Sequence, residues 1–174
     1  VSRMFHERIT GIEYQVANTD TQALLACDVP YKISIGDDLT AGKGVGGDPE
    51  KGARAAEESK DDIYEAVRDA DMVFIAAGMG GGTGTGAAPV IAQIVKETGA
   101  LTVGVVTRPF AFEGNIRAKQ ADAGIKKLKE QVDTLLVIPN ERLHIICGDE
   151  VTASNAFKPY AVLYCAVLSV PDTS

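Results

Sequence analysis

The stretch Ala77-Gly78-Met79-Gly80-Gly81-Gly82-Thr83-Gly84-Thr85-Gly86-Ala87-Ala88 decides the fold of this chain. Six of the nine residues from Gly78 to Gly86 are glycine, which costs more backbone entropy than a simple turn requires. Glycines let a backbone approach a ligand closely, and successive N–H groups at a helix N-terminus attract anions. The stretch therefore predicts a phosphate-binding loop, to which Thr83 and Thr85 add hydroxyl donors.

Strand and helix patterns alternate on both sides of this loop. Apolar runs rich in β-branched residues predict buried strands over 72–77, 101–106 and 135–138, an alternating pattern predicts an edge strand over 31–35, and a weaker strand is expected over 13–17. Helical patterns run from Asp48 to Ala70, over 89–97 and over 121–132. Strands and helices of these lengths predict a single α/β domain with a three-layer, mostly parallel, Rossmann-like sheet and helices on both faces.

Composition excludes several classes of protein. The 174 residues include 17 Lys and Arg against 24 Asp and Glu, a net charge of −7 with no clustered cations, so nucleic acid is not an expected partner. The apolar runs are much shorter than the roughly 20 residues of a membrane span, so we expect no membrane insertion. Three widely spaced cysteines (Cys27, Cys147 and Cys165) give no disulfide framework and favour a reducing cytosol.

Two other phosphate-loop patterns have partial counterparts in this chain. A Walker A motif fails, because the spacing from Gly36 to Gly42-Lys43 is one residue too long and Gly44 replaces the hydroxyl residue. The dinucleotide pattern Gly82-x-Gly84-x-x-Ala87 does match, and Arg108 occupies the place of the expected acid, as if to bind a 2′-phosphate. An NADP-binding Rossmann oxidoreductase is therefore one alternative, although it leaves the stretches around Asn18 and Pro109 unexplained.

Five stretches taken together resemble the nucleotide loops of the tubulin/FtsZ GTPase family, in its bacterial cell-division branch. Besides the glycine run 80–86, they are residues 18–24, 42–50, 106–114 and 138–143, in the family's order and within about residues 1–150. The resemblance implies a GTP or GDP site at the carboxyl ends of the strands, with Mg²⁺ carried by the nucleotide.

The resemblance also assigns roles to individual residues. Glu113 would accept a hydrogen bond from the ribose, Arg117 would pair with phosphate, and Asn140 and Phe157 would contact guanine. Glu113 and Arg117 lie four residues apart at a helix start and so face the same way, which is also the spacing of an ordinary surface ion pair. The full predicted set of nucleotide-binding residues is Gly80, Gly81, Gly82, Thr83, Gly84, Thr85, Gly86, Asn18, Pro109, Glu113, Arg117, Asn140 and Phe157.

For the whole protein, the resemblance implies a GTP-hydrolysing cytoskeletal protein that polymerises head to tail into the bacterial cell-division ring. A heterologous contact of that kind produces open polymers. Its expected location is the cytoplasm at the division site, and its expected partners are copies of itself and other cell-division proteins.

The chain departs from the family pattern at both ends. We expect the family's first strand and first glycine loop to be missing, residues 152–170 to begin the central helix, and the second domain to be absent. Lys158-Pro159 stands where that helix should carry an Asp, and the catalytic pattern Asn-x-Asp-x-x-Asp does not occur. We therefore expect no catalytic residue in this chain and no activity from it alone, so a catalytically silent fragment or interaction module of the same family is a second alternative. His144 and Cys147 lack a second ligand pair, so no metal site is predicted.

Overall fold

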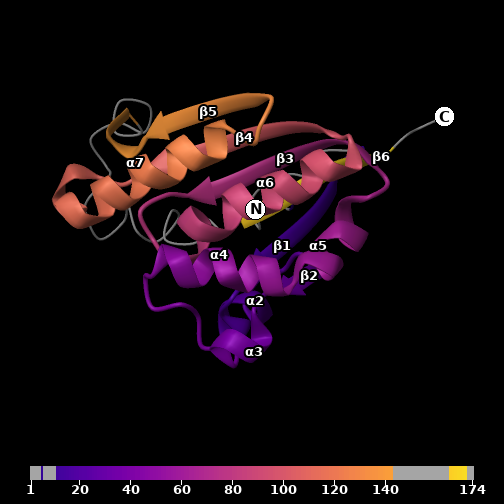
Figure 1. The fold of residues 1–174 in the computed structure, drawn as a ribbon, viewed down its shortest axis with the longest axis horizontal. Coiled ribbons are helices and arrows are strands. Elements are labelled where there is room, and N and C mark those ends of the chain that lie inside the picture. Colours follow the sequence, from indigo (N-terminus) through magenta and orange to yellow (C-terminus); the bar gives the residue numbers. More distant parts are fainter. Residues whose placement is uncertain (1–4, 6–10, 143–164, 172–174) are drawn as a thin grey trace.

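The computed structural model describes Phe5, residues 11–142 and residues 165–171, which form one six-stranded sheet in the order β2-β1-β6-β3-β4-β5 (Figure 1). The strands are β1 Glu13–Asn18, β2 Tyr31–Ser34, β3 Ala70–Gly78, β4 Leu101–Arg108, β5 Thr134–Pro139 and β6 Cys165–Pro171. The helices are α2 Thr21–Leu25, α3 Asp37–Thr40, α4 Pro49–Glu58, α5 Lys60–Val67, α6 Thr83–Thr98 and α7 Asn115–Lys129. Two 3₁₀ turns, η1 Ala111–Glu113 and η2 Asn140–Arg142, follow β4 and β5.

Every strand predicted from the sequence is present, and the pairings among these five strands are parallel. β1 pairs with β2, β3 with β4, and β4 with β5, each in parallel register. The alternating segment over 31–35 forms β2 at the edge of the sheet, as predicted. Val73 and Ile75 of β3 are fully buried, which explains the continuous apolar run of that strand.

The prediction of a helix over 152–170 is wrong for its last residues. Cys165–Pro171 forms strand β6, which pairs antiparallel with both β1 and β3, while residues 152–164 lie outside the described part. β1 and β3 do not pair with each other, so without β6 their facing backbone groups would be left unpaired in the middle of the sheet. β6 takes the position of the first strand in the doubly wound order 3-2-1-4-5-6. The helix over 152–170 was expected from the family resemblance, and the pairing of Cys165–Pro171 with β1 and β3 replaces it at the end of that range.

The described helices lie on both faces of the sheet, which confirms the predicted layers. α4, α5, α6 and α7 form one layer, and their apolar side chains share a core cluster with Val73, Ile75 and Val106 of the strands. On the other face, Leu24 of α2 packs with Tyr14 and Val16 of β1. These two residues alternate with Gln15 and Ala17, which face the first layer.

The helix predicted from Asp48 to Ala70 is two helices in the structure. It breaks at Ser59, whose backbone is non-helical (φ −97°, ψ 26°) and whose Oγ accepts a hydrogen bond from the Gly36 amide at 3.0 Å. A Cβ on Gly36 would come within 2.3 Å of the Ala55 Cβ. The segment after β2 therefore packs tightly against the C-terminal part of α4. A contact with a residue 23 positions away therefore ends α4, and no local signal in the sequence indicated it.

The predicted N-terminal cap of α4 is confirmed, and its removal has a measurable cost. Asp48 Oδ1 accepts hydrogen bonds from the amides of Glu50 and Lys51 at 2.9 and 3.4 Å. We expect Asp48→Ala to lower the free energy of unfolding by about 1 kcal/mol, because these amides lose their acceptor. Urea denaturation measures the change. Asp61→Ala, an exposed acid whose side chain caps no helix, is the control, and an equal loss in both variants would contradict the assigned cap.

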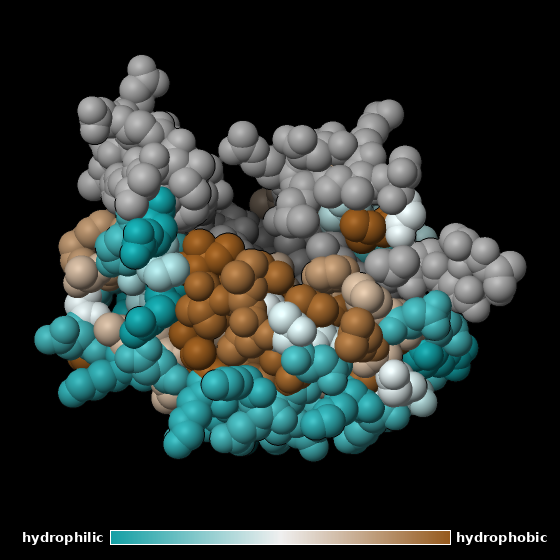
Figure 2. All heavy atoms as spheres, turned by 90° about the horizontal axis from the view of Figure 1, so that it is seen from above, coloured by the Kyte–Doolittle hydropathy of each residue, from teal (hydrophilic) through white to brown (hydrophobic). Residues whose placement is uncertain are grey.

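One side of the molecule carries apolar side chains at its surface. Figure 2 shows them gathered in the middle of the face seen from above, where β5 lies. Leu136 of β5 and Leu101 of β4 are 53% and 46% exposed. In the described ranges, no helix has both the length and the apolar character needed to cross a membrane.

Candidate functional site

The predicted loops meet at one edge of the sheet. β1, β3, β4 and β5 end at Asn18, Gly78, Arg108 and Pro139, and the register pairs Gly78 with Thr107 and Arg108 with Pro139. The arrowheads of β3 and β5 therefore point to the same side in Figure 1. Ligands of open α/β sheets bind at this carboxyl edge.

The glycine-rich loop joins β3 to α6 at this edge and presents free amide groups. Gly82 precedes the helix and supplies no side-chain cap. The Gly80 amide donates to Thr85 Oγ1 at 2.8 Å, and the Gly86 amide donates to the Gly82 carbonyl at 3.0 Å. The five amides between them, from residue 81 to residue 85, have no acceptor among the described residues. They form an anion site at the N-terminus of a 16-residue helix.

Most glycines of the loop are required by the protein's own packing. A Cβ on Gly82 would lie 2.5 Å from Val45 Cγ2, and one on Gly84 would lie 2.4 Å from the Gly78 carbonyl oxygen. A Cβ on Gly86 would lie 2.0 Å from the carbonyl oxygen of Pro49 in α4. Gly81 is different, because no described residue lies within 4 Å of the position its Cβ would take. Gly81 is therefore the position of the loop where backbone faces open space.

The two threonines of the loop have different roles. Thr85 is 3% exposed, and its Oγ1 accepts a hydrogen bond from the Gly80 amide. This buried hydrogen bond stabilises the conformation of the loop. The Thr85 hydroxyl, predicted as a donor to the ligand, thus holds the loop in place, while the Thr85 amide belongs to the row that faces the proposed anion site. Thr83 Oγ1 lies 2.8 Å from Thr19 Oγ1, and whichever hydroxyl accepts this bond keeps its own hydrogen for a ligand. Thr19 lies in the 18–24 stretch, but sequence reasoning gave it no role of its own.

The loop over 42–48 packs against the glycine loop and against the 18–24 stretch. The Gly44 amide donates to the Thr19 carbonyl at 3.0 Å, and the Thr21 amide donates to the Gly42 carbonyl at 3.0 Å. Gly42 has φ +70° and Gly44 has φ +76°, a left-handed backbone that favours glycine. A Cβ on Gly82 would also come within 2.8 Å of the Asp48 amide nitrogen. These contacts close one side of the site.

The start of α7 closes the other side. Arg117 Nη1 donates to Glu113 Oε2 at 2.6 Å, while Glu113 Oε1 accepts the Phe110 amide at 2.8 Å. The Arg117 side chain is 56% exposed, and the Glu113 side chain is 12% exposed. A Cβ on Gly80 would lie 3.1 Å from both the Arg117 carbonyl oxygen and Pro109 Cγ, so these residues border the glycine loop directly. The ion pair predicted from the spacing is thus present, next to the anion site.

Comparison with known proteins agrees with this arrangement. The family model described as Tubulin/FtsZ family, GTPase domain, matches residues 2–148. The empty FtsZ dimer from M. jannaschii is 49% identical with a TM-score of 0.87, and the match covers 91% of this chain and 46% of that one. The chain belongs to the tubulin/FtsZ family.

Two further structures of this family come from Haloferax volcanii. CetZ1, as a GDP-bound monomer, is 30% identical with a TM-score of 0.73, and the match covers 82% of this chain and 45% of that chain. CetZ2, as a GTPγS-bound protofilament, is 28% identical with the same TM-score, and the match covers 82% of this chain and 43% of that chain. The present chain therefore spans less than half the length of each of these relatives.

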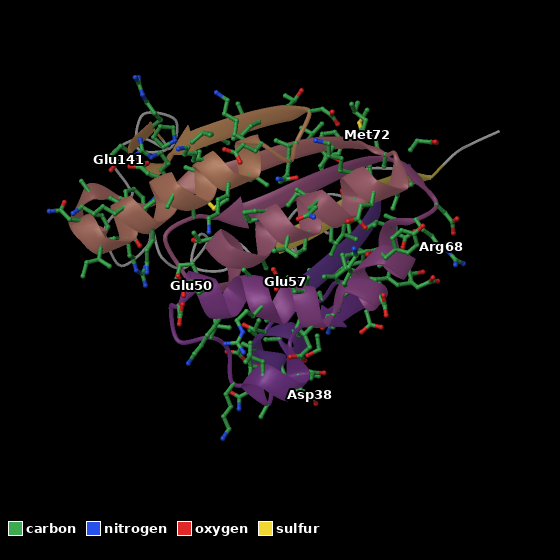
Figure 3. The ribbon with its side chains drawn as sticks, in the orientation of Figure 1. Asp38, Glu50, Glu57, Arg68, Met72 and Glu141 are labelled. Carbon is green, nitrogen blue, oxygen red and sulfur yellow. The ribbon has the colours of Figure 1, made fainter. Side chains whose placement is uncertain are left out.

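Two further predicted residues of the tubulin/FtsZ site lie at the same edge. Asn18 ends β1, and its Oδ1 accepts the Thr19 and Asp20 amides at 2.8 and 3.3 Å, while its Nδ2 hydrogens have no acceptor among the residues that the structure describes. Asn140 begins η2 directly after β5 and is half-buried. Glu141 Oε1 accepts the Ala111 amide at 2.7 Å and so ties η2 to the turn after β4. In Figure 3, Glu141 lies at the end of the sheet to which the strands point.

The remaining predictions lie elsewhere or fail. Phe157, His144 and Cys147 fall outside the described residues. Arg108, which the NADP alternative placed against a 2′-phosphate, forms an ion pair with Asp122 of α7. This pairing and the family membership remove the oxidoreductase alternative. Within residues 11–142, no group of three or more His, Cys, Asp or Glu side chains could hold a metal ion.

Proposed function

We propose that the complete protein binds GTP and GDP at this edge, hydrolyses GTP and assembles head to tail. The observation that carries the proposal is the row of amides from residue 81 to residue 85, which have no acceptor in the described part of the chain and follow Gly80, the neighbour of Arg117. A nucleotide supplies the phosphate chain, with Mg²⁺, that such a row of donors binds. The family's GTPase-domain model and the GDP and GTPγS bound in the CetZ structures support the choice of nucleotide.

Each residue of the site would hold one part of the nucleotide. The loop amides and one hydroxyl of the Thr19–Thr83 pair donate to phosphate oxygens. Arg117 keeps guanidinium N–H groups beyond the one that Glu113 uses, and these reach anions as charge-assisted donors. Glu113 retains lone pairs for a ribose hydroxyl, and Asn140 offers an amide to the base. Nothing in this set activates water, in keeping with the absence of the Asn-x-Asp-x-x-Asp pattern.

Assembly is supported by apolar side chains next to the site. Phe112 stacks on Phe110 with ring centroids 5.0 Å apart and is still 61% exposed. Ile116, four residues later, is 77% exposed. The structures of an FtsZ dimer and a CetZ2 protofilament show that relatives self-associate. We therefore place a subunit contact on this surface and propose a polymer at the cytoplasmic division site, where other cell-division proteins bind it.

Replacing both exposed side chains tests this contact. In the complete protein, we expect Phe112→Ser with Ile116→Ser to raise the critical concentration for GTP-dependent assembly by about tenfold, because apolar anchors dominate such interfaces. Sedimentation measures assembly, and nucleotide affinity should stay unchanged. Leu25→Ser, at a residue 73% exposed on α2, is the matched control. Unchanged assembly in the double variant would remove the contact from this surface.

The alternative is a catalytically silent interaction module of the family. Hydrolysis by the complete protein distinguishes the two functions. If catalysis needs two subunits, phosphate release per molecule should rise steeply with protein concentration. Tight GTP binding without phosphate release at any concentration would support the silent module.

A further inference from the structure

Thr19 is a buried residue at the carboxyl edge of the sheet, between β1 and α2. It is 1% exposed, and its Oγ1 lies 2.8 Å from Thr83 Oγ1 at the start of α6. Neither hydroxyl has a second partner among the residues that the structure describes. The direction of this hydrogen bond therefore decides which of the two hydroxyl hydrogens is available to a ligand.

Burial determines that direction. If Thr83 were the donor, the Thr19 hydroxyl would keep a hydrogen without an acceptor at a place that solvent does not reach. An unsatisfied buried donor is costly and correspondingly rare. Thr83 is only partly buried and belongs to the row of amides, so its own hydrogen can reach solvent or a ligand. The arrangement in which Thr19 donates and Thr83 accepts leaves neither hydroxyl unsatisfied.

The backbone of Thr19 is held on two sides, which makes its hydroxyl a fixed donor. The Thr19 carbonyl accepts hydrogen bonds from the Gly44 amide at 3.0 Å and from Thr40 Oγ1 at 3.3 Å, and the Thr19 amide donates to Asn18 Oδ1 at 2.8 Å. Thr83 lies in the first turn of α6, and a helical threonine divides between two χ1 rotamers. The hydrogen bond from Thr19 selects one of them.

We infer that Thr19 is a positioning residue for the nucleotide. It donates to Thr83 Oγ1, holds that side chain in one rotamer and leaves the Thr83 hydrogen for a phosphate oxygen. The inference rests on the proposed function and decides which member of the pair binds the ligand. A hydroxyl that accepts a hydrogen bond is polarised and becomes a stronger donor. Thr19 thus affects nucleotide binding without touching the nucleotide.

Nucleotide titration of the complete protein tests this role. We expect Thr83→Ala to weaken GTP binding by about tenfold, the equivalent of one hydrogen bond to a charged group, and Thr19→Val to weaken it by about threefold. Thr19→Ser keeps the hydroxyl and should recover most of the affinity. In the Thr83→Ala background, Thr19→Val should cause no further loss, because both substitutions remove the same interaction. A purely structural effect of Thr19→Val would instead appear in full in both backgrounds, which would overturn the inference.

Thr102→Val is the matched control. Thr102 is also 1% exposed, and its Oγ1 donates to the Ala100 carbonyl at 3.2 Å. It lies at the start of β4, whereas the nucleotide site lies at the other end of the strands. Loss of this buried hydroxyl should lower the unfolding temperature and leave GTP affinity unchanged. Equal losses of affinity in Thr102→Val and Thr19→Val would overturn the inference.

Neutron diffraction from crystals of the deuterated wild-type protein needs no variant, so it decides the question even if Thr19→Val does not fold. The deuterium between the two oxygens should be bonded to Thr19, and one bonded to Thr83 would overturn the inference. GTP affinity that falls in Gly81→Ala and Thr83→Ala but not in Thr19→Val would overturn this inference alone. Unchanged affinity in Gly81→Ala and Thr83→Ala would contradict the nucleotide site itself.

Discussion

Gly81→Ala should lower the affinity of the complete protein for GTP and GDP by at least about tenfold, the equivalent of one lost charge-assisted hydrogen bond. Gly81 faces open space at the amide row, so an added methyl group would project where phosphate approaches rather than into protein. Its φ lies outside the left-handed region, so alanine takes the same backbone without strain. Thermal unfolding without nucleotide should therefore match the wild type. Fluorescent-nucleotide titration measures the affinities.

Gly84→Ala is the matched comparison for Gly81→Ala. Its methyl group would lie 2.4 Å from the Gly78 carbonyl oxygen, so the loop must shift and the unfolding temperature should fall. The two alanine variants thus separate a glycine needed by the ligand from a glycine needed by the fold. Wild-type GTP affinity in Gly81→Ala would show that phosphate does not approach the loop backbone at this residue.

Arg117→Ala should cost roughly 1.5–3 kcal/mol of nucleotide binding free energy, the usual value of a hydrogen bond to a charged group. The backbone of Arg117 borders Gly80, directly before the row of amides, and Glu113 accepts from only one of the guanidinium nitrogens. Arg117→Lys keeps the charge but loses the planar fork, so we expect an intermediate loss. Affinities for GTP and GDP in the three proteins measure the effect.

Arg68→Ala controls for the loss of an exposed arginine that pairs with carboxylates far from the site. It should leave nucleotide affinity unchanged. If Arg117→Ala also left it unchanged, the Glu113–Arg117 contact would be an ordinary surface ion pair of the kind that its spacing alone allows.

Much of this protein follows from local sequence signals. Apolar runs indicated three strands because strands in a parallel sheet are covered on both faces, and an alternating pattern indicated the edge strand β2. Asp48 caps α4 as predicted, because the cap depends on neighbouring amides only. The glycine run indicated an anion site since the free amides belong to the first turn of a helix, which sequence alone can locate. The Glu113–Arg117 pair followed from helical spacing.

Contacts between distant residues decided the rest. Why each glycine is needed depends on what faces it: Pro49 opposes Gly86, whereas nothing opposes Gly81. Ser59 ends α4 because the Gly36 amide requires an acceptor. Cys165–Pro171 is a strand because two separate parts of the sheet lack a partner between them. In each case the stabilising free energy comes from a contact between groups far apart in the sequence. A local sequence pattern cannot identify such a partner.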